Sequence, residues 1–139
     1  MKQGNIYTSS FPSNPPAWYW ARGLHDACII GVEALEFPFD YNRFIKEKEN
    51  YCRNLFTLKL DAKGALFDTS IKEILLYNYK ILSEDVSLEN RKQIWWKADR
   101  LTDYARYYIL EIDLADFDAD PEEFTFKIKF DRAEVYRKK

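Results

Sequence analysis

Histidine is almost absent from this 139-residue chain, which holds only His25, and cysteine occurs twice, as Cys28 and Cys52. A zinc site needs three or four cysteine or histidine ligands in compatible geometry, and these two cysteines lack a CxxC spacing. We therefore expect no metal and no other cofactor. The shortage of histidine also removes most acid–base mechanisms, although a dyad between His25 and Cys52 across space stays open.

Recognised catalytic and ligand motifs are missing as well. With only four glycines the chain has no glycine-rich phosphate loop, and neither GxSxG nor HExxH occurs. Asp116, Asp118 and Asp120 match the first three ligand positions of a calcium-binding EF-hand loop. However, Pro121 stands where that loop requires glycine and Lys127 where it requires glutamate. We interpret this acidic segment as a solvated loop between two strands.

An excess of charge of one sign is lacking too. Lys plus Arg number 21 and Asp plus Glu 23, for a formal charge of -2, so we expect no nucleic-acid partner. No hydrophobic run reaches the length of a membrane span, and residues 1–16 contain no signal-peptide core. We expect a cytoplasmic protein with reduced cysteines and no membrane partner.

Aromatic residues, by contrast, are abundant. They make up 17% of the chain, and all apolar residues together make up 47%. Aromatic and β-branched side chains suit a pleated, half-buried surface, so this composition favours strands. The length is that of one domain, and we predict a single domain over residues 1–139. Serine and proline punctuate residues 1–16, which we predict to be an irregular N-terminal arm.

Hydrophobic patterning defines the expected strands. Period-two alternation predicts strands at 55–60, 94–98, 104–114 and 124–130, the last continuing after a bend at 131–132. Residues 28–32 are apolar on both faces, which indicates a central strand that Pro38 ends. Between these, residues 39–53 carry alternating charge and predict an exposed loop or a short surface helix.

Two segments decide the fold class. Gly64 predicts a hairpin after 55–60, and residues 100–103 are the expected connector of a second hairpin. Residues 71–82 are ambiguous: Ser70 and Glu73 have capping-box spacing, but the segment is rich in strand formers, and we predict a strand. The expected fold is mainly β, an antiparallel sandwich or a strongly curved sheet of about six or seven strands with at most one or two short helices. A helix at 71–82 would make it α+β.

The pair His25 and Asp26 is the first candidate site. A carboxylate beside an imidazole can fix its tautomer and raise its basicity. On a strand, however, adjacent side chains point to opposite faces, so we expect these two not to pair. The alternatives are a turn that hydrogen-bonds the backbone at the entrance of the first long strand, or a small enzyme or small-molecule binder with a cleft here, rimmed by Trp18 or Trp20.

Two tryptophan pairs form the second candidate site. Trp18 and Trp20 flank Tyr19, and Trp95 adjoins Trp96. On an extended segment one ring of each pair can enter the core, and the other must be covered by the arm, a ligand or a partner. Tryptophan and tyrosine are enriched at interface hot spots, so these rings are candidate binding residues, with plain core packing as the alternative.

One segment carries a family resemblance. Arg22-Gly23-Leu24-His25-Asp26-Ala27-Cys28-Ile29 resembles the Leu/Phe-His-Asp opening of a loose group of small uncharacterised bacterial β domains. Some of these are similar to immunity proteins of polymorphic toxin systems. In that group the His-Asp turn leads into the first strand, and an alternating strand such as Phe124–Phe130 comes late. The resemblance implies a non-enzymatic module that binds protein, either another chain or itself as a homodimer.

Overall fold

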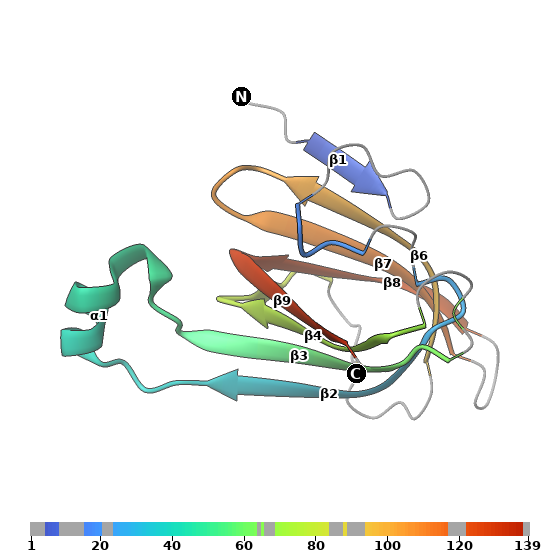
Figure 1. Cartoon of the computed structure of the whole chain (residues 1–139), viewed down its shortest axis with the longest axis horizontal. Coiled ribbons are helices and arrows are strands. Elements are labelled where there is room, and N and C mark those ends of the chain that lie inside the picture. Colours follow the sequence, from blue (N-terminus) through green and yellow to red (C-terminus); the bar gives the residue numbers. More distant parts are fainter. Residues whose placement is uncertain are drawn as a thin grey trace.

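The chain forms one antiparallel β-sheet that wraps around a single core. The structure, a computed structural model, describes residues 5–8, 16–20, 24–63, 65, 69–83, 88, 94–116 and 122–137. Within these ranges a nine-stranded sheet is accompanied by one short α-helix, so the predicted mainly-β class is confirmed. The elements in chain order are β1 (Asn5–Thr8), β2 (Cys28–Glu36), α1 (Tyr41–Glu47), the 3-10 turn η1 (Lys48–Asn50), β3 (Asn54–Asp61), β4 (Ile71–Tyr77), β5 (Lys80–Ile81), β6 (Ile94–Asp103), β7 (Tyr108–Asp116), β8 (Glu122–Phe130) and β9 (Arg132–Arg137) (Figure 1).

The two ends of the sheet meet at a corner. The strand order is β5-β8-β7-β6-β2-β3-β4-β9, with β1 added beside β6. Strand β5 follows β4 after two residues, Asn78 and Tyr79, and β9 follows β8 after a single residue, Asp131. Tyr77 accordingly pairs with Arg132 at one end of the order, and Lys80 pairs with Lys129 at the other. All strands belong to one hydrogen-bonded sheet, so the predicted sandwich is not confirmed.

The strand count differs from the prediction for two reasons. The bends near Asn78 and Asp131 divide two long runs into four strands. Asn78 takes a positive φ of 53°, a conformation that asparagine tolerates well. In addition, Asn5–Thr8 pairs with β6 as a strand, although it lies in the segment predicted to be irregular. The remainder of residues 1–15 lies outside the described residues.

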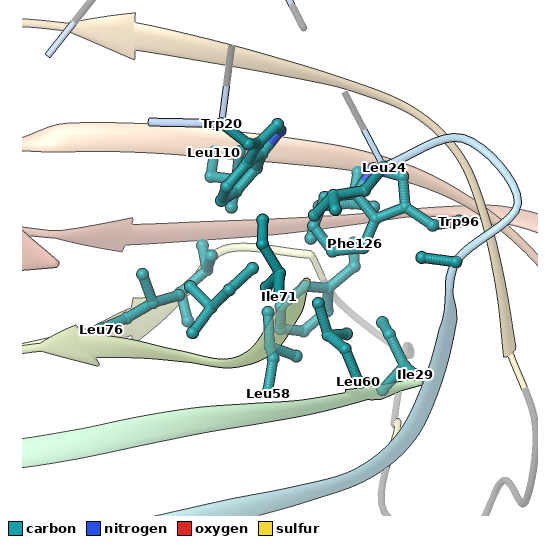
Figure 2. Close-up of a cluster of buried hydrophobic side chains, with 14 of the residues drawn as sticks. Trp20, Leu24, Ile29, Leu58, Leu60, Ile71, Leu76, Trp96, Leu110 and Phe126 are labelled. Carbon is teal, nitrogen blue, oxygen red and sulfur yellow. The ribbon is translucent and has the colours of Figure 1, made fainter. Parts of the chain in front are cut away.

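The core lies between the two halves of the wrapped sheet. Figure 2 shows Leu110 and Phe126 on one side and Leu58 and Leu60 on the other, with their side chains directed toward each other. The rings of Phe56 on β3 and Phe126 stack with centroids 5.7 Å apart, although β7, β6 and β2 separate their strands in the sheet order. Burying such a side chain fully contributes roughly 1.5–3 kcal/mol, so the packing of these facing side chains stabilises the wrapped sheet.

Most of the alternating segments form the predicted strands. Segments 55–60, 94–98 and 124–130 lie in β3, β6 and β8, and the ambiguous 71–82 contains β4 and β5. The predicted connector at 100–103 is wrong, because β6 continues to Asp103 and the turn lies at 104–107. There the Tyr104 N–H donates to the carbonyl of Tyr107, and Ala105 has a φ of 74°.

The other connections are described only in part. Residues 39–53 contain α1, as one of the two predicted alternatives requires, and Asp40 caps it by accepting from the Arg43 N–H at 3.1 Å. The expected hairpin glycine, Gly64, lies outside the described residues. So do Asp118, Asp120 and Pro121 of the calcium-like segment.

Candidate functional site

The His-Asp segment is a tight turn that leads into β2. The Ala27 N–H donates to the Leu24 carbonyl at 2.8 Å, which closes a four-residue turn with His25 and Asp26 at its centre. Asp26 has a φ of 73°, in the left-handed region that this turn position requires. The Asp26 N–H donates to the Trp96 carbonyl at 2.9 Å, so the turn is fixed to β6.

The expectation that His25 and Asp26 do not pair is wrong. The His25 Nδ1 and Asp26 Oδ2 atoms lie 3.1 Å apart, because the alternation of a strand does not apply within a turn. Both side chains are about half exposed, at 54% and 51%. Such an exposed pair contributes about 0–1 kcal/mol to stability, so it acts as a local surface contact.

Among the described residues, neither cysteine lies where it could form a catalytic dyad with His25. Cys52 precedes Asn54, which pairs with Glu36 at one end of the β2–β3 hairpin, whereas Cys28 lies at the other end. Nine residues of extended strand span roughly 25 Å, so a dyad of His25 with Cys52 is excluded. The two cysteines form no disulfide in the described structure. The described residues also contain no cluster of three or more metal-ligating side chains.

A buried carboxylate organises residues 18–20, which we call the aromatic segment. Asp99 on β6 is only 6% exposed and accepts hydrogen bonds from the Nε1 atoms of Trp20 and Trp96, each at 2.9 Å. The Tyr19 hydroxyl donates to its other oxygen. Burial, together with the nearby Asp99 charge, raises the pKa of Tyr19 well above its ordinary value. Residues far apart in sequence are thereby joined at one point inside the protein.

The four candidate tryptophans divide by burial. Trp20 and Trp96 are fully buried, so they offer no surface to a partner. Trp18 is half-buried, with its ring edge-on to Tyr108 at 5.4 Å, and Trp95 is half-buried on β6. On β6, Trp96 enters the core and the neighbouring Trp95 lies at its margin, whereas Trp18 and Trp20 belong to a turn in which the half-buried Trp18 ring also packs against the core.

A projecting apolar surface was missed from the sequence. Figure 1 shows β2 and β3 running out to α1 at one end of the molecule, away from the remaining strands. None of the residues Tyr41–Glu47, all of which the structure describes, is buried. Six large apolar side chains here are 40–67% exposed, out of ten such side chains in the described part of the chain. We call these six the apolar tip: Leu35, Phe37, Phe39, Tyr41, Phe44 and Ile45.

Ring contacts give the apolar tip a defined shape. The centroids of Phe39 and Phe44 lie 5.7 Å apart, and each ring also contacts buried Tyr51, at 5.9 and 5.6 Å. The Tyr51 hydroxyl accepts from the Asp40 N–H at 2.9 Å, which ties the entry of α1 to its exit. The aromatic residues between Phe37 and Phe44 are the sequence feature that could have indicated this tip. They were overlooked because the charged residues around them indicated only an exposed loop or helix.

One edge of β2 is open beside this tip. Strand β2 pairs with β3 along its whole length but with β6 only at Cys28 and Ile29. Among the described residues, no strand pairs with 31–36 on the side away from β3. Because the Phe37 N–H donates to the Arg53 carbonyl at 2.9 Å, the antiparallel alternation directs the backbone groups of Val32, Ala34 and Glu36 toward the open side.

Polar clefts occur at the corner of the sheet. One of about 660 Å³ is lined by residues from four turns, and it includes neither His25 nor Asp26. Its lining residues are Asn50, Asn78, Ala105, Arg106, Asp131 and Arg132.

Comparison of the chain with protein-family models, with curated proteins and with solved structures finds no match. Within the described ranges, no helix has both the length and the apolar character needed to cross a membrane.

Proposed function

We propose that this chain is a non-catalytic protein-interaction module that contacts its partner through the apolar tip. The observation that carries this proposal is the short helix α1, which buries none of its described residues while large apolar side chains around it stay exposed. A seven-residue helix gains little stability by itself, so burial of this surface by a partner would stabilise it.

The size of the tip supports a binding role. A large apolar side chain exposes roughly 200 Å² when free, so six side chains at about half exposure present about 600 Å². That value lies at the upper end of the largest apolar patches on monomeric proteins, and such patches are often functional. The tip also stands clear of the core, where a partner can reach it (Figure 1).

The remaining chemistry fits a non-enzymatic role. The single histidine forms an exposed contact with Asp26, and the resemblance to immunity-like domains implies protein binding. We extend the proposal to the cytoplasm, where Cys28 and Cys52 would stay reduced. An inhibitor of a second protein is the narrower form of the same proposal.

Photo-crosslinking at single positions tests this function. A benzophenone amino acid replaces Phe39 in the tip, and the matched control carries it in place of Tyr136, an exposed aromatic residue on β9. The chain is expressed in its native host, irradiated, and its adducts are resolved by mass. We expect adducts from position 39 and none from position 136. Equal labelling at both positions, or none at position 39, would contradict the proposal.

A further inference from the structure

We infer that two copies of this chain pair through the open edges of β2, antiparallel and about a two-fold axis at Ala34. This inference rests on the proposed function and names its partner as a second copy. The surface involved combines the open side of Gly31–Glu36 with the apolar tip that follows it. An exposed strand edge is a template for another strand, and natural proteins commonly block such edges with lysine or proline. Neither residue occurs between Gly31 and Glu36.

The backbone favours an axis at Ala34. With Ala34 opposite its own copy, Val32 lies opposite Glu36 in both directions, so all three outward-facing residues form rungs. This arrangement makes roughly six inter-chain hydrogen bonds. An axis at Leu35 would place Val32 opposite Pro38, which has no N–H to donate.

The charges favour the same axis. With Ala34 at the centre, Glu33 faces Leu35 of the other copy, and Glu36 faces Val32, so no like charges stand opposite each other. An axis at Glu33 would place two glutamates directly opposite, which is destabilising. The small side chain of Ala34 also lets the two strands approach closely at the axis.

The apolar surfaces become complementary in this arrangement. Because the second strand runs in the opposite direction, Phe37 of one copy faces Gly31 of the other. Gly31 has no side chain, which leaves room for the ring, and aromatic residues commonly cover strand glycines in this way. Next to Gly31, Ile30 is 54% exposed and borders an open cleft of about 320 Å³. The tip of each copy therefore reaches the most exposed apolar residue at the base of the other copy's β2.

The area is sufficient for a stable dimer. If each tip buries roughly 600 Å² against the second copy, the two together bury about 1,200 Å², the lower limit of standard interfaces. The backbone rungs along β2 add to this area. The paired edge would also remove the template for unlimited strand addition, because each copy has then used its open side.

Light scattering after size exclusion tests the pairing on the full-length chain. We expect the wild type to have twice the 16.6 kDa chain mass. Ala34→Pro removes an outward N–H in each copy and leaves the β3 pairing intact, so we expect a roughly 30-fold weaker dimer. Ala34→Ser, which keeps both the N–H and a small side chain, is the matched control and should stay dimeric. A monomeric wild type at about 100 μM, or an Ala34→Pro dimer of unchanged affinity, would overturn the inference.

A cysteine variant keeps the test decisive if Ala34→Pro does not fold. Ala34→Cys places two thiols directly across the axis, where mild oxidation should form a covalent dimer. The matched control is Ala98→Cys, on an exposed position of β6, which should stay monomeric on denaturing gels. Equal crosslinking of both variants contradicts the pairing. A monomeric wild type whose position 39 crosslinks to a different protein overturns only the self-pairing, whereas absence of any tip adduct overturns the proposed function itself.

Discussion

Replacing Asp99 by alanine should be among the most damaging single changes in this protein. The substitution removes the acceptor shared by Tyr19, Trp20 and Trp96, and all three donors stay buried. Each buried donor left without a partner costs about 1–3 kcal/mol, so the loss is roughly 3–9 kcal/mol. The whole domain is stable by about 5–15 kcal/mol, and Asp99→Ala is therefore expected to lose most of its stability.

Urea unfolding followed by tryptophan fluorescence measures this loss. Asp99→Asn keeps one acceptor oxygen of the same shape, so its free energy of unfolding should lie between those of the wild type and Asp99→Ala. Asp113→Ala is the matched control: this aspartate lies on the neighbouring strand β7, is exposed, and accepts from the Thr125 hydroxyl. We expect it to change stability by less than about 0.5 kcal/mol.

A small loss would refute the reasoning. Burial of a carboxylate has a desolvation cost of its own, which Asp99→Ala also removes. If Asp99→Ala loses less than about 1 kcal/mol, that cost cancels the three hydrogen bonds, and the cluster positions the aromatic segment without stabilising the fold.

Three further predictions concern the aromatic segment and the turn at Ala105. The pKa of Tyr19 is raised, so above pH 10 the unfolded chain releases a proton that the folded chain retains, and stability falls by up to about 1.4 kcal/mol per pH unit. Urea midpoints between pH 9 and 11 should fall less steeply for Tyr19→Phe, and parallel slopes would argue against this. Ala105→Gly relieves a φ of 74° and should raise the free energy of unfolding by ~0.5–1 kcal/mol, and a lower melting temperature contradicts it. Trp20→Ala should cost ~3–5 kcal/mol and half-buried Trp18→Ala clearly less, so equal losses would refute the burial argument.

The strands could be predicted wherever one face is buried and the other wetted. In β8, Phe126, Ile128 and Phe130 are buried while the residues between them are not, and the sequence alternates in the same way. Strand β1 has four residues, too few for such a pattern, and it exists because β6 offers it a partner about 95 positions away. The end of β6 was misjudged because Leu101 is buried in a polar stretch, where alternation is hard to see.

The contacts of the candidate site were harder to predict than the strands. Some join residues far apart in the sequence, and others depend on the local geometry of a turn. No local pattern joins Trp20 to Asp99 across 79 positions, so nothing in the sequence marks Asp99 as a buried acceptor. The prediction that His25 and Asp26 do not pair was wrong for the opposite reason, because strand geometry was applied to two adjacent residues of a turn. The apolar tip could have been found, because Phe37, Phe39 and Phe44 lie in a segment whose charges already indicated exposure.

The cluster around Asp99 also sets an order of events during synthesis. Tyr19 and Trp20 precede their acceptor by 80 and 79 residues, so the ribosome releases the two rings long before Asp99 exists. At about 5–20 residues per second, this interval lasts roughly 4–16 s. The nascent chain therefore carries these two side chains without their hydrogen-bond acceptor while about 80 further residues are made.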